Sequence, residues 1–154
     1  METTNTTGWL LSKMILLATH HHMGQVDKAG EPYILHVLHV MQALNTKDEE
    51  LQCIAIGHDL IEDTAVDEEE LRYYGMTERV IAGIVALTKF KTEKTDRYHE
   101  YKARVKANPD AVRVKIEDIK HNMDLSRLRE VSDIDYKRMD KYRVFLVELE
   151  RLVY

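Results

Sequence analysis

The residues best suited to chemistry are concentrated in the stretch 57–64, Gly-His-Asp-Leu-Ile-Glu-Asp-Thr, which holds one imidazole and three carboxylates. In a helix, residues four apart lie on one face, so His58 would share a face with Glu62, and Asp59 with Asp63. An imidazole and carboxylates directed at one spot suit a divalent metal ion and an activated water molecule. The stretch therefore predicts part of a metal site, and the remaining ligands must come from other segments.

Three residues on other apolar segments are candidates for those ligands. His36 and His39 lie three residues apart in the apolar stretch 33–44, so both face partly inward and either can be the ligand. Asp118 falls on the side of its helix that Asn122 shares, four residues on. An acid on the core side of a helix needs a partner. For Asp118 this partner is a metal ion or a lysine.

Helical periodicity dominates the chain, and no stretch shows the period-two alternation of a strand. Four start signals support the helices: Thr46 with Glu49 as a capping box, Asp67 with Glu70, Asn108 before Pro109, and Ser132. We expect helices at about residues 9–21, 33–44, 47–62, 67–75, 78–90, 108–123 and 133–153. The polar segment 89–104 is expected to be a mobile flap followed by a further helix. The predicted fold is a single all-α bundle of about eight helices, in one domain over residues 1–154.

Composition narrows the class of protein further. The chain has 154 residues, of which 44% are hydrophobic and 32% charged, as in a globular domain. The net charge of -5 and the lack of a dense basic stripe argue against a nucleic-acid partner. No apolar run approaches the roughly 20 residues that span a bilayer. The single cysteine, Cys53, cannot form an internal disulfide, so we expect a cytoplasmic protein without a membrane partner.

Taken together, these segments resemble the HD-domain metal-dependent phosphohydrolases, and most closely their (p)ppGpp hydrolase branch, which comprises the hydrolase half of RelA/SpoT proteins and the stand-alone small hydrolases. The resemblance runs in the family's order and spacing from about residue 15 to 128. It is carried by His22-Met23-Gly24-Gln25, Gly30-Glu31-Pro32-Tyr33-Ile34-Leu35-His36, residues 58–64, Leu87-Thr88-Lys89-Phe90 and residues 114–123.

The resemblance implies a function and a set of site residues. The reaction is removal of the 3′-diphosphate from ppGpp-like guanosine nucleotides, which belongs to the stringent response, and the products are GDP or GTP and pyrophosphate. One divalent metal, Mn²⁺ as is usual in the branch, with Fe²⁺, Co²⁺ or Zn²⁺ as alternatives, would be held by His36, His58, Asp59 and Asp118. Glu62 and Asp63 would orient or deprotonate the attacking water, and Lys28, Asn122 and His22 would bind the nucleotide substrate. Whether the chain forms a homo-oligomer stays open.

The chain departs from the family pattern at several positions. Asp27 stands where the branch has a basic residue that is thought to lie against the guanine, and Val37 replaces the proline after His36. An acid cannot make a cation–π contact with a base and would repel phosphates. Two alternatives therefore stay open: an HD-type phosphatase or phosphodiesterase for another nucleotide, and a metal-binding module that senses a nucleotide without turning it over. We expect no synthetase or regulatory domain beside this one.

Overall fold

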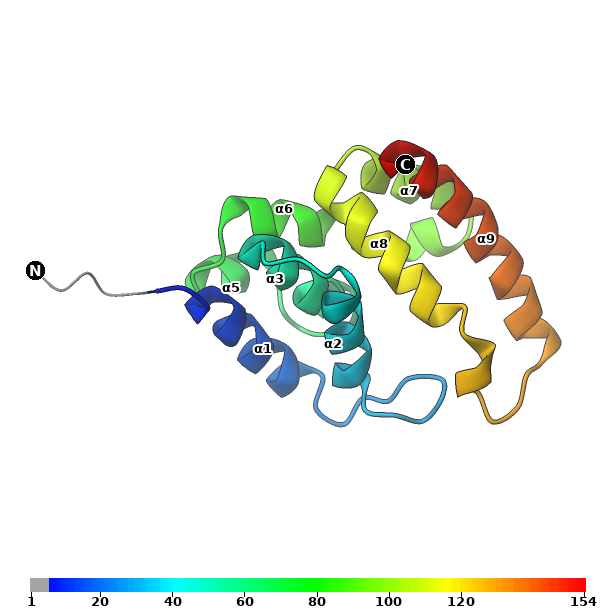
Figure 1. Ribbon diagram of the computed structural model, residues 1–154, viewed down its shortest axis with the longest axis horizontal. Coiled ribbons are helices and arrows are strands. Elements are labelled where there is room, and N and C mark those ends of the chain that lie inside the picture. Colours follow the sequence, from blue (N-terminus) through cyan, green and yellow to red (C-terminus); the bar gives the residue numbers. More distant parts are fainter. Residues whose placement is uncertain (1–5) are drawn as a thin grey trace, which may run out of the picture.

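The computed structural model describes residues 6–154, and in this range the chain forms nine α-helices and two 3₁₀ turns with no β-strand (Figure 1). The predicted all-α class is confirmed. The elements are α1 (Trp9–His21), α2 (Tyr33–Ala43), α3 (Glu49–Gly57), α4 (Leu60–Asp63), α5 (Glu68–Tyr73), α6 (Glu78–Ala86), η1 (Lys91–Lys94), α7 (Tyr98–Lys106), α8 (Pro109–Asn122), η2 (Leu125–Arg127) and α9 (Asp133–Val153).

Helix α3 occupies the middle of the core because it is apolar on nearly every side. Six of its nine residues are buried, including the run 53–57. It packs against α1, α2, α6 and α8. A helix that is apolar all round is stable only when other elements surround it. This burial fixes His58, the residue that follows α3, in the interior of the protein.

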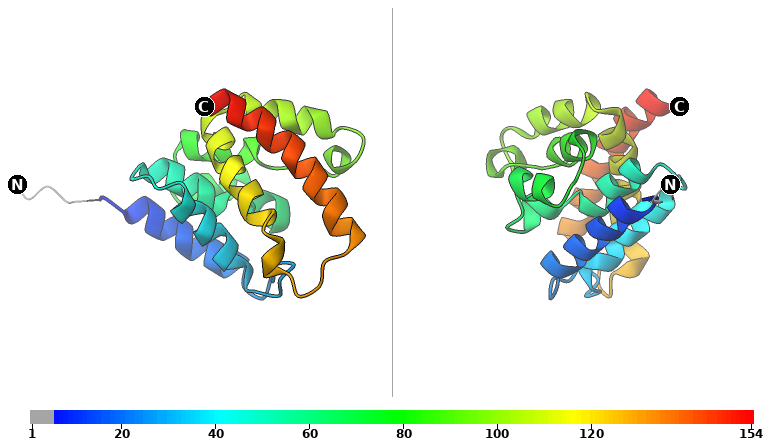
Figure 2. Two further views of the ribbon diagram at one scale, coloured as in Figure 1. Left: turned by 45° about the vertical axis from the view of Figure 1, so that its right-hand side comes forward. Right: turned by 90° about the vertical axis from the view of Figure 1, so that its left-hand side faces the viewer.

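Helix α8 contacts α2 and α3 as well as α9, so it joins the first helices of the chain to the last one (Figures 1 and 2). The loop between α1 and α2 and the segment after α8 lie at the same end of the molecule (Figure 1). An ion pair between Asp27 and Arg127 connects them. The carboxylate of Asp118 on α8 is thereby brought against α2 and the end of α3.

The predicted continuous helix over 47–62 is wrong at its chemically important point. Helix α3 ends at Gly57, and α4 begins at Leu60 after Asp59, whose φ of -106° and ψ of 1° are not helical. The ring nitrogen Nδ1 of His58 lies 2.7 Å from the carbonyl oxygen of Ala55, which in a continuous helix would accept from the N–H of Asp59. The two ends of the 57–64 stretch therefore lie on separate short helices.

The predicted capping box of Thr46 and Glu49 is also wrong. Asp48 caps α3 instead, and its carboxylate accepts from the N–H of Leu51 at 3.3 Å. The Glu49 carboxylate is used elsewhere, since it accepts from the free N–H groups that begin α1, at Gly8, Leu10 and Leu11. A carboxylate is favourable at a helix N-terminus. Glu49 thus joins the start of α1 to the start of α3.

The other three predicted caps are confirmed. Asp67 accepts from Glu70 N–H, Asn108 from Ala111 N–H, and Ser132 forms a capping box with Asp135. The helix predicted to reach residue 90 ends at Ala86, and residues 89–104 form η1 and most of α7, held by an ion pair from Arg104 to the buried Glu93. None of the helices described is long and apolar enough to cross a membrane.

Replacing Gly83 by alanine should destabilise the contact between α6 and α3. A Cβ atom at Gly83 would lie 2.6 Å from Cδ1 of Ile54, which is closer than real Cβ contacts allow. We expect Gly83→Ala to lower the free energy of unfolding by about 1–3 kcal/mol, the usual cost of overpacking. Urea unfolding measures it. Ile54→Val removes the closest methyl group, so it should cost less in the Gly83→Ala background than in the wild type, whereas additive costs would contradict this explanation.

Candidate metal centre

His58 presents an unpaired nitrogen to two carboxylates in the interior. Its Nδ1 must carry the proton, because its neighbour at 2.7 Å, the Ala55 carbonyl, can only accept. In the neutral ring, the other nitrogen, Nε2, is then an acceptor. This atom is buried without a hydrogen bond, yet it lies 2.9 Å from Asp59 Oδ2 and 3.4 Å from Asp118 Oδ1. Three electron-pair donors facing one another need a cation between them.

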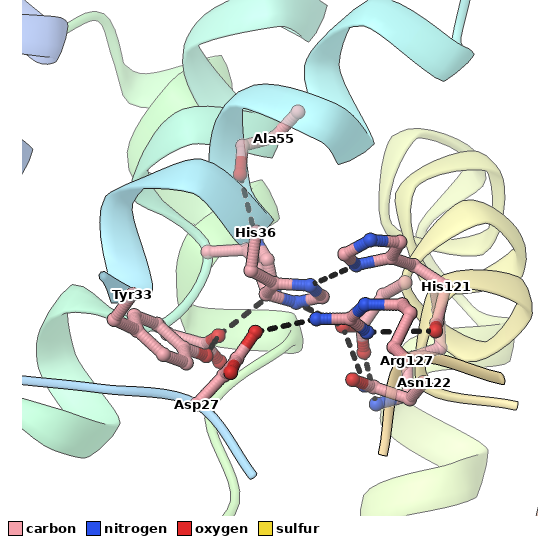
Figure 3. Close-up of polar contacts among 11 residues, drawn as sticks. Asp27, Tyr33, His36, Ala55, His121, Asn122 and Arg127 are labelled. Carbon is pink, nitrogen blue, oxygen red and sulfur yellow. Dashed lines mark hydrogen bonds and ion pairs between the residues drawn. The ribbon is translucent and has the colours of Figure 1, made fainter. Parts of the chain in front are cut away.

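His36 is oriented in a similar way by a second histidine. Its Nδ1 lies 2.7 Å from Nδ1 of His121, and its Nε2 lies 2.8 Å from Asp118 Oδ1 (Figure 3). Burial, followed by the charge of Arg127, lowers the pKa of His121 to about 4. A neutral His121 can accept the proton of His36 Nδ1, which leaves the lone pair of His36 Nε2 for the site. Hydrogen bonds of this kind commonly orient histidines that bind metals.

His39, the competing candidate, does not reach this cluster. Its ring stacks on His121, with the ring centroids 3.8 Å apart and the planes inclined by 20°. It therefore supports the residue that orients His36. Of the two histidines that the sequence left open, His36 is the one in the cluster, because the ligand atoms of His36, His58 and Asp118 lie within 4.8 Å of one another.

Asp118 has both of the partners considered from the sequence. Its Oδ1 faces His36 and accepts from the Asn122 side-chain amide at 3.0 Å, while its Oδ2 accepts from Lys115 Nζ at 2.8 Å. These residues recur at three- and four-residue spacing along α8, so they share one face. Although burial would raise the pKa of Asp118, the Lys115 ammonium holds it well below its usual value. The carboxylate is therefore ionised, as a metal ligand must be.

Asp59 lies next to this cluster, and Tyr33 orients it. The Tyr33 hydroxyl donates to Asp59 Oδ2, the same oxygen that lies near His58. Burial would raise the pKa of Asp59, but the positive charge of His58, when that ring is protonated, lowers it to about 2. The donor set of two imidazole nitrogens and two ionised carboxylates fits a divalent ion such as Mn²⁺, Fe²⁺, Co²⁺ or Zn²⁺.

Glu62 and Asp63 lie beside this cluster on α4. Single oxygens of Asp59, Glu62 and Asp63 lie within 4.8 Å of one another. Burial and then the charge of Asp59 raise the pKa of both Glu62 and Asp63. The N–H of Lys89 donates to Glu62 Oε1 at 2.6 Å, which fixes this carboxylate and leaves its second oxygen unassigned. A carboxylate with a raised pKa next to a metal site can exchange a proton with water.

A cavity of about 350 Å³ opens beside this cluster, and both acidic and basic side chains line it. Its lining includes His58, Asp59, Glu62, Asp63 and Asp118, together with five cationic side chains. The cationic side chains are Lys28, Lys89, Lys115, Arg127 and Arg138. Such an arrangement can hold a polyanion against a metal ion. A nucleotide that carries several phosphates has this chemistry.

The three predicted substrate-binding residues occupy different places. Lys28 and Asn122 line the cavity. His22 is not among the lining residues and is buried, with Nδ1 2.9 Å from Gln25 Oε1 and its ring 4.9 Å from Tyr33. Gln25 in turn donates to the carbonyl oxygen of Asp63. The position of His22 connects it to the backbone of the acidic pair.

Asp27 is not a free anion in the cavity wall. Its Oδ1 accepts from the N–H groups of Ala29 and Glu31 at 2.9 and 3.0 Å, and its Oδ2 is paired with Arg127 (Figure 3). Arg127 also donates to the carbonyl oxygen of His121 at 3.0 Å. The repulsion of phosphates expected from an acid at this position is therefore offset by a guanidinium from η2.

Sequence reasoning missed several residues that complete the site, including Tyr33, Lys115, His121 and Arg127. Lys115 was detectable, because it lies three residues before Asp118 and so shares its face of the helix. His121 and Tyr33 were not, because their roles depend on how α8 meets α2 and on the break after Gly57. Arg127 acts across 100 residues of sequence, and no local pattern pairs it with Asp27.

Sequence comparison finds relatives among enzymes of guanosine tetraphosphate metabolism, while no protein-family model matches the chain. The chain is 31% identical over 117 residues to the guanosine-3′,5′-bis(diphosphate) 3′-pyrophosphohydrolase of Haemophilus influenzae, covering 70% of the chain. It is 32% identical over 123 residues, 73% of the chain, to the bifunctional (p)ppGpp synthase/hydrolase SpoT of Escherichia coli K12. A third relative, over 74% of the chain, is a GTP pyrophosphokinase of Myxococcus xanthus at 30% identity. Each match covers 17% of the relative, so the chain corresponds to a small part of these proteins.

The fold has a counterpart among solved structures. A metazoan orthologue of SpoT, described as hydrolysing ppGpp, matches with a TM-score of 0.78 at 20% sequence identity. The match covers 96% of this chain and 88% of that one. The helices of this chain are thus arranged as in that solved structure.

Proposed function

We propose that this chain, an HD-type domain homologous to the ppGpp 3′-pyrophosphohydrolases, hydrolyses the 3′-diphosphate of ppGpp-like guanosine nucleotides. The products would be GDP or GTP and pyrophosphate. The observation that carries this proposal is the cluster of ligand atoms of His36, His58 and Asp118, with Asp59 Oδ2 2.9 Å from His58 Nε2 and close to Glu62 and Asp63, beside a cavity lined by five cationic side chains.

The four converging donors would hold one divalent ion, for which we propose Mn²⁺. Such an ion lowers the pKa of a bound water molecule and polarises a phosphoryl oxygen. The chain contributes the orientation of its ligands. Ala55 fixes the ring of His58 and His121 that of His36, so that each Nε2 is an acceptor directed into the site.

Glu62 and Asp63 are the proposed proton acceptors for the attacking water. Glu62 Oε1 is held by the N–H of Lys89, so its Oε2 is the oxygen that would take the proton. As the water oxygen bonds to phosphorus, the bond from phosphorus to the 3′ oxygen breaks. The pyrophosphate leaves as an anion, the 3′ oxygen gains a proton from solvent water, and the proton taken up by Glu62 returns to solvent. Lys28, Lys89 and Arg138 line the cavity and offset the charge of the phosphates.

Removing the Tyr33 hydroxyl should weaken metal binding without removing a ligand. In Tyr33→Phe, Asp59 loses the donor that holds its Oδ2. We expect the affinity for Mn²⁺ to fall about 10- to 100-fold, as for other residues that orient metal ligands. Isothermal titration of metal-free protein measures it. Tyr136→Phe, at an exposed position on α9, is the matched control and should bind Mn²⁺ as the wild type does. Equal affinity in Tyr33→Phe would contradict this role.

A second candidate function is the hydrolysis of another nucleotide, and Asp27 is the observation that favours it. The Asp27 carboxylate is occupied by two backbone N–H groups and Arg127. Position 27 therefore does not offer a nucleotide the basic side chain that the (p)ppGpp hydrolase branch has there. The metal cluster and the acidic pair would serve either substrate. The two functions therefore differ only in which nucleotide is preferred.

A substrate panel tests the proposal. The protein loaded with Mn²⁺ is incubated with ppGpp, pppGpp, a phosphorylated dinucleotide cofactor, a nucleoside monophosphate and a cyclic nucleotide, and products are separated by anion exchange. We expect GDP and pyrophosphate from ppGpp at a higher kcat/KM than from any other compound outside the (p)ppGpp pair. Preference for another nucleotide would replace the substrate but keep the enzyme. Binding of ppGpp without products would indicate a sensor.

A further inference from the structure

Lys115 is a largely buried cation at the proposed metal site that neither the proposed ligand set nor the proposed proton transfer uses. Its side chain is 12% exposed, and its Nζ lies 2.8 Å from Oδ2 of Asp118. The same Nζ lies 5.7 Å from the ring centroid of the buried Tyr101. The carboxylate it contacts is a proposed metal ligand, so its effect on that ligand can be derived from geometry.

The two oxygens of Asp118 are divided between different partners. Oδ1 lies 2.8 Å from His36 Nε2 and 3.4 Å from His58 Nε2, and it also accepts from Asn122. Oδ2 is directed to Lys115. An aspartate with two free oxygens can bind a metal through one or both of them. Here the ammonium occupies the second oxygen.

We propose that Lys115 is a positioning residue that restricts Asp118 to binding the metal through Oδ1 alone. This keeps one coordination position of the ion for water or a phosphoryl oxygen. Catalytic metal sites differ from structural ones in having such an open position. The inference rests on the proposed metal site, and it adds the group that keeps this site reactive.

The charge of Lys115 has a second consequence, which runs against metal binding. An ammonium beside Asp118 repels a divalent ion that this aspartate binds, and in a buried site this repulsion is weakly screened. Lys115 thus weakens binding of the ion while it keeps one coordination position open. Loss of Lys115 should change metal affinity and activity in opposite directions, which a residue needed only for folding would not do.

The experiment compares Lys115→Met with the wild type in three measurements on folded protein. We expect the affinity for Mn²⁺ to rise about tenfold or more, kcat for ppGpp to fall about 10- to 100-fold, and the number of exchangeable water molecules on bound Mn²⁺ to drop by one. Water-proton relaxation counts these molecules. Lys120→Met is the matched control, because Lys120 lies on the same helix with a 45% exposed side chain and a 3.7 Å ion pair to Glu117.

Two further variants separate the hydrogen bond from the charge. Lys115→Arg keeps both and should retain the water count of the wild type. Lys115→Gln keeps a donor without the charge, so it should bind Mn²⁺ more tightly with an unchanged water count, and it decides the question if Lys115→Met does not fold. A parallel fall of Mn²⁺ affinity and kcat, or an unchanged water count in Lys115→Met, would overturn the inference. A wild type that binds no Mn²⁺ or releases no pyrophosphate would instead overturn the proposed function.

Discussion

Asp59→Ala is expected to lower kcat/KM for ppGpp by roughly three orders of magnitude while the protein stays folded. Asp59 is one of the four proposed ligands, and its Oδ2 is the atom that His58 and Tyr33 both face. Metal-assisted charge stabilisation contributes several kcal/mol to hydrolytic transition states. Since about 1.4 kcal/mol corresponds to a tenfold change in rate, loss of about 4 kcal/mol gives this factor.

Three measurements check this expectation. Steady-state release of pyrophosphate gives kcat/KM, metal analysis of the purified variant gives the bound ion, and circular dichroism gives the helix content. Asp140→Ala is the control, because Asp140 is an exposed acid on α9, paired only to Arg143 within the described contacts. Near wild-type activity in Asp59→Ala, with folding intact, would exclude Asp59 from the metal centre.

Glu62→Gln is expected to bind the metal normally yet lose about 10²- to 10⁴-fold in kcat, the range for a lost general base. The amide oxygen of glutamine can still accept from the N–H of Lys89, so the side chain should stay in place. It cannot take a proton from water. Glu62 is also not among the four converging ligands, which is why affinity for Mn²⁺ should be unchanged.

The comparison of Glu62→Gln with Asp59→Ala separates the two roles. Asp59→Ala should lose both metal and activity, whereas Glu62→Gln should lose activity alone. Glu78→Gln is the control, because Glu78 is exposed and paired with Arg72 far from the cavity lining. If Glu62→Gln keeps its kcat, proton transfer belongs to Asp63 or to a phosphate of the substrate.

The sequence predicted the helical class because apolar residues at helical spacing and most capping residues are local signals. Glu49 shows that such local signals do not predict tertiary contacts. Its position three residues after Thr46 matches a capping box, but the carboxylate serves the N-terminus of α1, about 40 residues earlier in the chain. Local spacing identifies a capable side chain, and tertiary packing decides which helix it caps.

The site, like the helix caps, was predictable only in part. The ligand set of His36, His58, Asp59 and Asp118 was predicted from the resemblance to the HD-domain phosphohydrolases, whereas the residues alone left open the choice between His36 and His39 and the partner of Asp118. The break between α3 and α4, where His58 Nδ1 lies against the Ala55 carbonyl, was not predictable from the local spacing. The partners that fix tautomers and charges, His121 and Arg127, arise from contacts between distant segments.

The most direct test is a titration of metal-free protein with Mn²⁺, in which bound metal and pyrophosphate released from ppGpp are measured on the same samples. We predict one Mn²⁺ per chain, with the rate of release proportional to the fraction of chains that hold the ion and abolished by a chelator. Pyrophosphate release that is independent of bound metal, or full occupancy without any release, would contradict the central claim that this cluster is a hydrolytic metal site.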